Sequence, residues 1–324
     1  RHVELPLVAT NRIHMPDVAE KILAEGQADM VSMARPLLAD PHWLNKAKTG
    51  QAHLINTCIA CNQACLDHVF ENKKASCLVN PRACRETELN YPAAQAKKRI
   101  AVVGAGPAGL SFATVAAGRG HQVTLFDAAD EIGGQFNYAK QIPGKEEFHE
   151  TIRYYTNLLA KHGVETRLGK AVTADHLKQS GFDEVVLATG ITPRGLRLPG
   201  SDNPKVLSYL DVLRDKKPVG NSVAIIGAGG IGFDVAEYLL HNQSSTLDVK
   251  QWMQDWGVDP NFESKGGLLP PKPHDPARQI WLLQRSAGKP GARLGKTTGW
   301  IHRAALKMGG VQAWGGIEYV SIGV

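Results

Sequence analysis

Residues 99–127, RIAVVGAGPAGLSFATVAAGRGHQVTLFD, decide the fold of this chain. A hydrophobic strand leads into Gly104-x-Gly106-x-x-Gly109, then into a helix of small residues and a second strand that ends at Asp127. The first glycine allows a tight turn, the second lets a pyrophosphate approach the backbone, and the third permits close helix–strand packing. The helix N-terminus attracts phosphate, and an acid at the end of the second strand accepts hydrogen bonds from a ribose. The segment therefore predicts a dinucleotide site.

Two later segments favour a flavin as this dinucleotide. Residues 131–136, EIGGQF, supply a second glycine turn that includes Gly134 and Gln135. Residues 183–190, DEVVLATG, indicate a strand whose closing turn is common in flavoproteins with two dinucleotide domains. An ordinary strand end would give the same pattern, so this second segment is weaker than the first.

Residues 223–232, VAIIGAGGIG, repeat the strand–glycine–helix pattern with Gly227, Gly229 and Gly232. The following strand ends in Gln284-Arg285 instead of an acid. An acid at this point would hold a free ribose 2′-hydroxyl, whereas a cation accommodates a 2′-phosphate. We therefore expect NADPH rather than NADH, with Arg285 as the first candidate contact and Lys289 as the second. A solvated basic surface is the alternative.

The composition indicates a globular protein. With 324 residues, of which 43% are hydrophobic and 21% charged, the chain is long enough for two or three domains with cores of their own. The net charge of +6 is too small to imply nucleic acid. The basic excess is local, because residues 276–317 contain no acid but seven basic residues: Arg278, Arg285, Lys289, Arg293, Lys296, Arg303 and Lys307. This segment predicts an anionic ligand.

Residues 243–278 are expected to form an insertion that covers the site or an exposed loop.

No membrane span is expected. Residues 101–118 carry no charge and reach the lower length limit of a spanning helix, but their four glycines and Pro107 indicate a strand–turn–helix instead. Because no signal peptide precedes Arg1, we expect a cytoplasmic protein. The chain begins within the lead-in to a strand, so we also expect it to be a piece of a longer protein.

All five cysteines lie within 27 residues. The first four, Cys58, Cys61, Cys65 and Cys77, follow the pattern C-x2-C-x3-C-x11-C, and the fifth is Cys84. An odd, clustered set without a secretory signal argues against a disulfide scaffold. Four thiolates are the usual ligands of a [4Fe–4S] cluster. A structural zinc site usually pairs two C-x2-C knuckles, and the second knuckle is missing here. The spacing favours iron–sulfur, with zinc as the alternative and Cys84 outside the ligand set.

The first fifty residues have a β-loop-α-β-loop-α pattern with a basic residue, Arg12 or Arg35, after each strand. In a (β/α)8 barrel the loops after the seventh and eighth strands form the usual phosphate site. Taken alone, two such units would suit any parallel sheet.

The whole chain resembles the NADH:flavin oxidoreductases that include trimethylamine dehydrogenase, and among them the bacterial NADPH-dependent 2,4-dienoyl-CoA reductases. The similar segments run from the end of the barrel to the second dinucleotide domain: 29–41, 58–65 with 77–81, 131–136, 141–146, 206–213 and 295–303. The resemblance implies an α/β fold that comprises the end of a (β/α)8 barrel, an iron–sulfur segment and two Rossmann-like domains. The expected boundaries are 1–49, 50–97, 98–205 and 206–324.

The resemblance also implies an electron relay. NADPH would pass a hydride to FAD, single electrons would cross the cluster to FMN, and FMN would reduce a 2,4-dienoyl-CoA thioester of unsaturated fatty acid β-oxidation. The residues carried over are Arg12, Ala34 and Arg35 for FMN; Ala108, Gly109, Asp127, Gln135, Arg153 and Val172 for FAD; Arg285 and Lys289 for NADPH; and Cys58, Cys61, Cys65 and Cys77 for iron. From the pattern alone, Arg153 is a charge on a helix surface and Val172 a strand residue.

The substrate pocket and the proton donor would lie in barrel strands that precede residue 1 in the family, so no catalytic residue is assigned here. Two other functions fit the sequence less well. One is a related enzyme with the same relay and another substrate, such as an enoate reductase or a trimethylamine dehydrogenase-like enzyme. The other is a zinc-stapled binding protein that senses dinucleotides.

Overall fold

A computed structural model describes residues 3–323 of the chain. The backbone contacts divide it into two compact units, Arg1–Lys140 with Glu147–Thr192, and Gln141–Glu146 with Pro193–Val324. This division is coarser than the four parts expected from the sequence, whose boundaries stay a prediction.

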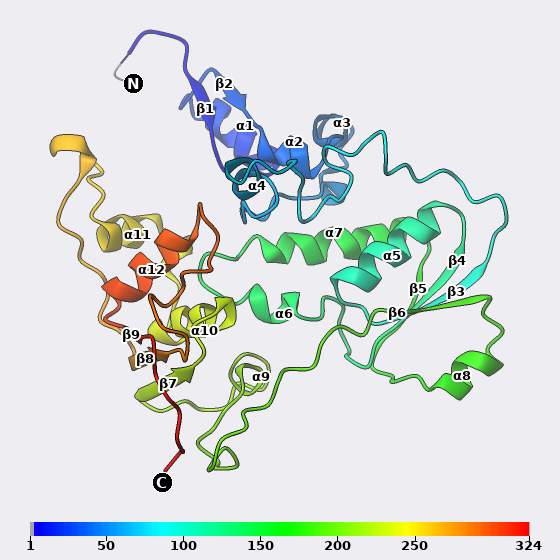
Figure 1. Ribbon diagram of the computed structural model, residues 1–324. Coiled ribbons are helices and arrows are strands. Elements are labelled where there is room, and N and C mark those ends of the chain that lie inside the picture. The colour runs from blue at the N-terminus through cyan, green and yellow to red at the C-terminus, as the bar shows by residue number, and fades with distance from the viewer. Residues whose placement is uncertain (1–2, 324) are drawn as a thin grey trace. The chain divides into compact units, whose positions relative to one another are not determined.

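The first unit begins with two βα repeats (Figure 1). Strands β1 (Val8–Thr10) and β2 (Met30–Ser32) pair in parallel, and the helices are α1 (Pro16–Ala24), α2 (Arg35–Ala39) and α3 (Trp43–Lys48). The sequence did not predict α2. With five residues it is too short to show a helical period, and it begins beside Pro36, a residue that is tolerated only in the first turn of a helix.

The cysteine segment is mostly irregular and contains η1 (Ala52–Leu54) and α4 (Leu66–Phe70). Side-chain amides attach it to α2: Asn80 Nδ2 donates to the Leu38 carbonyl over 2.9 Å, and Asn56 Nδ2 donates to the Ala39 carbonyl over 3.4 Å. The buried Asp40 carboxylate accepts from the Asn56 backbone N–H at 2.8 Å and from Lys46 at 2.6 Å. These bonds compensate the cost of burying polar groups and fix the path of the loop.

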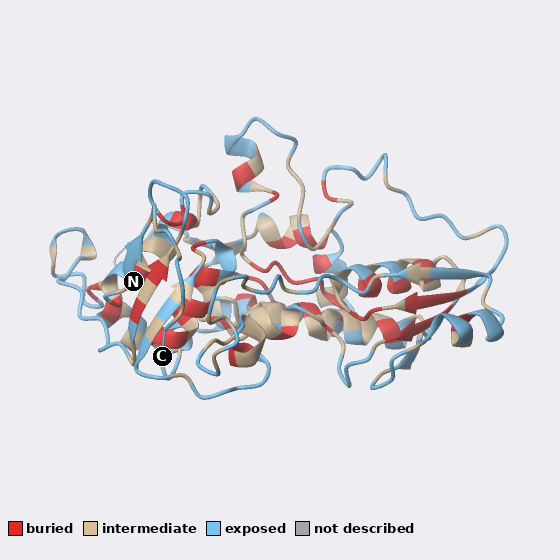
Figure 2. Cartoon of the chain, turned by 60° about the horizontal axis from the view of Figure 1, so that its bottom comes forward, coloured by how far each residue is buried: buried red, intermediate tan, exposed pale blue. Residues whose placement is uncertain are grey.

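The next sheet has the parallel order β5-β4-β3-β6, from β3 (Arg99–Val103), β4 (Gln122–Phe126), β5 (Glu165–Arg167) and β6 (Glu184–Leu187). Its helices are α5 (Pro107–Gly118), α6 (Phe136–Ala139), α7 (Phe148–Lys161) and α8 (Ala174–Gln179). Strands β3 and β4 are buried almost continuously, as expected for a parallel sheet covered on both faces. Figure 2 shows the buried residues in red. The buried core of this domain includes Val102, Leu110 and Leu125.

The second unit holds a parallel sheet of order β7-β8-β9, from β7 (Ser222–Ile226), β8 (Gln279–Leu283) and β9 (Gln312–Trp314). The other elements are α9 (Tyr209–Leu213), α10 (Gly230–Leu240), η2 (Ser245–Leu247), α11 (Val249–Trp256), η3 (Lys265–Gly267) and α12 (Gly299–Met308). The segment between α10 and β8 is more ordered than the sequence suggested. In it the buried Asp255 carboxylate accepts from Gln251 at 2.9 Å and pairs with His274 at 3.2 Å.

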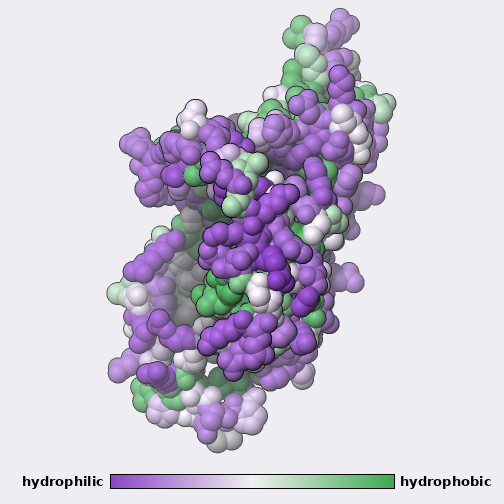
Figure 3. Space-filling model, turned by 90° about the vertical axis from the view of Figure 1, so that its right-hand side faces the viewer, coloured by the Kyte–Doolittle hydropathy of each residue, from purple (hydrophilic) through white to green (hydrophobic). Residues whose placement is uncertain are grey.

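Among the helices of residues 3–323, none has the length and apolar character needed to cross a membrane. The face seen in Figure 3 is predominantly hydrophilic, with apolar residues in small areas.

The pairing of α10 with α12 predicts a pH-dependent stability. His302 Nδ1 lies 2.8 Å from Oε1 of the buried Glu237, and this hydrogen bond raises the pKa of His302 above its ordinary value. A raised folded-state pKa gives stabilisation that is complete below the ordinary pKa and is lost as pH rises through the folded-state pKa. We expect His302→Asn to lower the free energy of unfolding more at about pH 6 than at about pH 9.

Chemical denaturation of the wild-type protein and the variant at both pH values measures this difference. The exposed His149 provides the control, because His149→Asn should cost little at either pH. An equal loss for His302→Asn at both pH values would contradict the assignment.

Candidate cofactor sites

In the first glycine loop, Gly104 and Gly109 are closely packed, whereas Gly106 faces open space. A Cβ on Gly104 would lie 2.2 Å from the Ala188 carbonyl oxygen, and one on Gly109 would lie 1.8 Å from the Gly104 carbonyl oxygen. Gly104 also has a φ of +110°, a conformation that favours glycine. A Cβ on Gly106 would meet no atom within 4 Å. The loop therefore leaves room at Gly106, where a pyrophosphate would approach.

Asp127 follows β4, and both of its carboxylate oxygens bond to backbone N–H groups. Oδ2 accepts from Ala105 at 2.5 Å and Oδ1 accepts from Ala129 at 2.8 Å. The Asp127 carbonyl accepts from Lys170 N–H at 3.1 Å, and Val172 packs against an apolar cluster that includes Phe126. Asp127 thus holds the glycine loop in place. Its contact with a ribose and the contact of Val172 with FAD stay predictions.

The second glycine turn lies against the first loop. The Gly133 N–H donates to the Ala105 carbonyl over 2.8 Å, and a Cβ on Gly134 would lie 3.0 Å from Gly106 Cα. Gln135 and Ala108 are exposed. The structure therefore brings together the two segments that the sequence assigned to one flavin.

The other glycine loop repeats this design in the second unit. Gly227 has a φ of +114°, a Cβ on Gly232 would lie 1.9 Å from the Gly227 carbonyl oxygen, and a Cβ on Gly229 would meet nothing within 4 Å. Strands β7 and β8 are parallel, so Arg285, two residues beyond β8, lies at the same carboxyl edge as the loop. Arg285 and Lys289 are both exposed. A cation at this edge can accommodate a ribose 2′-phosphate, and the contact of either residue with NADPH stays a prediction.

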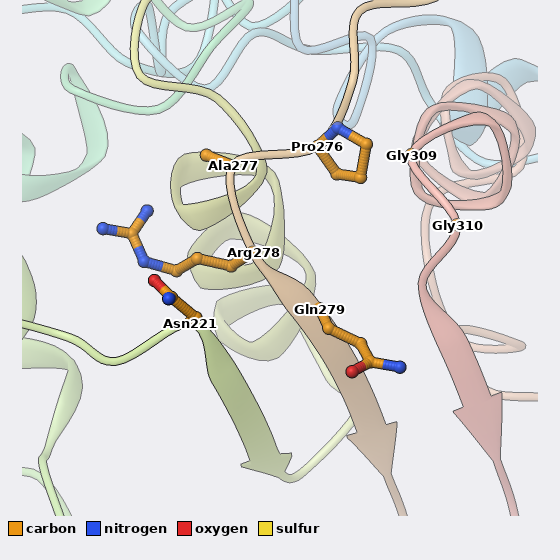
Figure 4. Close-up of a pocket in the computed structure, with 7 residues that line it drawn as sticks. All are labelled: Asn221, Pro276, Ala277, Arg278, Gln279, Gly309 and Gly310. Carbon is orange, nitrogen blue, oxygen red and sulfur yellow. The ribbon is translucent and has the colours of Figure 1, made fainter.

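A hollow in the same unit lies at the opposite edge of the sheet. Residues at or just before the starts of the three strands line it: Asn221, Pro276, Ala277, Arg278, Gln279, Gly309 and Gly310. In Figure 4 the Asn221 and Arg278 side chains extend from neighbouring strand starts. Ligands of open α/β sheets bind outside the carboxyl ends of the strands, so this hollow is not the nucleotide site.

Four of the five cysteines line one pocket. Its residues are Arg35, Leu38, Cys58, Ile59, Cys61, Asn62, Ala64, Cys65, Cys77, Leu78 and Val79. The Ser76 N–H donates to the Ala64 carbonyl over 2.6 Å, which brings the loop of Cys77 against the first three cysteines. Cys84 does not line this pocket and is exposed. The pocket thus gathers the four thiols that the spacing had grouped.

Burial raises the pKa of the Cys58 and Cys61 thiols, and raises that of Cys77 to about 11. As free thiols they are protonated at neutral pH, so iron or zinc would have to displace their protons. Within residues 3–323, no three Cys, His, Asp or Glu side chains surround a single point closely enough to hold one ion. A [4Fe–4S] cluster binds one thiolate at each of four irons, so its ligands surround a larger group.

The two arginines predicted to bind a phosphate follow β1 and β2 as expected, and each has partners. Arg12 pairs with Glu147, which directly precedes α7. Arg35 donates to Asn62 in the cysteine loop and to Asn11 after β1. Sequence reasoning missed the roles of Glu147 and both asparagines, because their partners are distant in the chain and no local pattern links them.

Arg153, predicted as an FAD contact, lies on α7. Its guanidinium donates to the carbonyl oxygens of His53 and Ile55, the latter at 2.8 Å, and to Thr57 Oγ1 at 3.0 Å. It therefore ties the helix of the dinucleotide domain to the chain immediately before Cys58. A contact with FAD stays a prediction.

These features define a flavoprotein-type pair of dinucleotide domains joined to the end of a barrel, and comparison with known proteins supports this class. Residues 1–53 match the NADH:flavin oxidoreductase / NADH oxidase family, and residues 98–251 match the pyridine nucleotide-disulphide oxidoreductase family. These matches support the family NADH:flavin oxidoreductase / pyridine nucleotide-disulphide oxidoreductase for the chain. The predicted fold class is confirmed.

Three similar proteins illustrate the relationship. The metal reductase of Desulforamulus reducens is 43% identical over 76% of this chain and 37% of its own length. The cinnamate reductase of Clostridium sporogenes is 36% identical over 78% of this chain and 38% of its own length. The structure of 2-naphthoyl-CoA reductase with 2-naphthoyl-CoA is 30% identical, with a TM-score of 0.84 over 99% of this chain and 44% of that one. The chain spans less than half of each.

The glycine geometry predicts different effects at neighbouring positions. We expect Gly109→Ala to lower the free energy of unfolding by about 1–3 kcal/mol, because its Cβ overlaps a backbone oxygen. Gly106→Ala should change stability by less than about 0.5 kcal/mol and still reduce the FAD content, because the space it fills is the one left for the ligand. Denaturation and flavin quantification on the purified holoenzyme measure both effects. Full FAD content in Gly106→Ala would contradict this account.

Proposed function

We propose that this chain is the electron-transfer part of an iron–sulfur flavoenzyme that uses NAD(P)H to reduce a carbon–carbon double bond conjugated to a carbonyl group. The observation that carries the proposal is the pocket lined by Cys58, Cys61, Cys65 and Cys77. It lies in a segment that follows the end of a flavin-family barrel and precedes a flavin-type glycine loop.

The residues present fit the proposed cofactors. Four thiols and an otherwise largely apolar lining suit a [4Fe–4S] cluster, and the open space at Gly106 and Gly229 suits two dinucleotides. Bound flavins and a cluster would supply the step from paired to single electrons. The chain's own residues position them: Asp127 fixes the first glycine loop, Arg153 fixes the approach to Cys58, and Arg35 connects the loop after β2 to the cysteine loop.

Two relatives support the proposed substrate class. The cinnamate reductase and the 2-naphthoyl-CoA reductase act, by their names, on an aryl enoate and an aryl thioester. These relatives favour reduction of an enoate or an unsaturated thioester over the narrower reading of 2,4-dienoyl-CoA alone. We keep 2,4-dienoyl-CoA as one candidate substrate and cinnamate as the other.

The first test uses the holoenzyme purified without oxygen. We expect NADPH oxidation under anaerobic conditions to depend on an added conjugated acceptor, and either 2,4-dienoyl-CoA or cinnamate to support it. A saturated acyl-CoA is the matched control, because it has no double bond to reduce. The absence of turnover with every conjugated acceptor, in a protein that contains both flavins, would contradict the proposed reaction.

The second test concerns the nucleotide. We expect Arg285→Gln to raise the KM for NADPH by about ten- to a hundredfold, because a charge-assisted hydrogen bond to the 2′-phosphate is lost. The KM for NADH should hardly change, since NADH has no such phosphate. Lys307→Gln, in the same acid-free segment but on α12, should change neither value. Equal changes in the KM for NADPH and the KM for NADH would support a general basic surface instead of a phosphate contact.

A further inference from the structure

Arg35 belongs to two sites at once. It is the first residue of α2, in the loop proposed to hold a flavin phosphate, and its side chain also lines the pocket of the four cysteines. Nη1 donates to Asn62 Oδ1 over 2.7 Å, and Nη2 donates to Asn11 Oδ1 over 2.6 Å. Asn62 directly follows Cys61, and Asn11 directly follows β1. The guanidinium therefore bridges the barrel loop and the cysteine loop.

The two asparagines are suited to hold it. Both have left-handed backbones, with φ of +76° at Asn11 and +57° at Asn62, and asparagine tolerates this conformation better than most residues. A planar guanidinium with five N–H donors can bond to two amide oxygens and still present donors elsewhere. Its orientation is thus fixed by partners on both sides.

A fixed positive charge in the pocket wall has a redox consequence. Reduction of an iron–sulfur cluster adds one negative charge, and a nearby cation stabilises that charge, more strongly where water is excluded. The pocket has such surroundings, because Cys58 and Ile59 are 8% and 7% exposed.

We propose that Arg35 sets the reduction potential of the cluster, as a cation shared between the flavin-phosphate loop and the cysteine pocket. This inference rests on the proposed function, because it requires a cluster at the four cysteines. Arg35 is a positioning and electrostatic residue here, and it transfers neither a proton nor an electron.

The test is a reductive titration of the anaerobic holoenzyme, followed by electron paramagnetic resonance of the reduced cluster. We expect Arg35→Gln to shift the midpoint potential to lower values, and Arg35→Lys, which keeps the charge, to shift it less. Arg82→Gln is the matched control. Arg82 lies five residues after Cys77 and bonds to Leu89 and Asn90 instead of lining the pocket, so its loss should leave the potential unchanged.

Loss of FMN from Arg35→Gln could itself change the potential, and Arg12→Gln separates the two effects. Arg12 is also a proposed phosphate contact but does not line the pocket. Equal shifts in both variants, in parallel with FMN loss, would overturn the proposal. So would an unchanged potential in Arg35→Gln with a full complement of iron.

If Arg35→Gln does not assemble a cluster, Asn62→Ala replaces it. This variant keeps the charge but releases one of its two anchors, and we expect a smaller shift in the same direction; an unchanged potential would overturn the inference. Absence of iron from the wild-type protein would instead contradict the proposed function. The two failures are therefore distinguishable.

Discussion

Helix α5 can lie against strand β3 only because Gly109 has no side chain. A Cβ there would lie 1.8 Å from the Gly104 carbonyl oxygen, and the corresponding distance between Gly232 and Gly227 is 1.9 Å. Each contact sets where its helix begins, and so directs free N–H groups at the space beside Gly106 or Gly229. The position of both proposed nucleotide sites, and of the sheets around them, depends on these two close approaches.

The cysteine segment depends on a different kind of interaction. It has little regular structure, so polar side chains hold its path. The segment's own Asn56 and Asn80 bond to backbone carbonyls of α2, and Arg153 attaches its beginning to α7. The segment is therefore joined both to the barrel end and to the first dinucleotide domain, as the proposed electron path between two flavins requires.

The sequence predicted the parts of the structure that local patterns encode. The glycine spacings, the order of strand and helix, and the position of Arg285 after β8 all follow from residues close together in the chain. Even the grouping of four cysteines without Cys84 could be read from their spacing, and the pocket has this grouping.

The contacts that sequence reasoning missed are long-range. Glu147 and its partner Arg12 are 135 positions apart, and Arg153 is 98 positions from Ile55. No periodicity links such residues, so Arg153 reads as a surface charge although its side chain is half-buried between two segments. Asp127 could be recognised by its place after the strand, but its bonds to Ala105 and Ala129 depend on the folded loop.

The central claim is that four particular thiols hold an iron–sulfur cluster, and the metal and acid-labile sulfide content of the holoenzyme tests it most directly. The account predicts iron and sulfide in equal amounts in the wild-type protein and in Cys84→Ser, and loss of both in Cys77→Ser. Zinc without sulfide in the wild-type protein, or equal loss in the two variants, would contradict it.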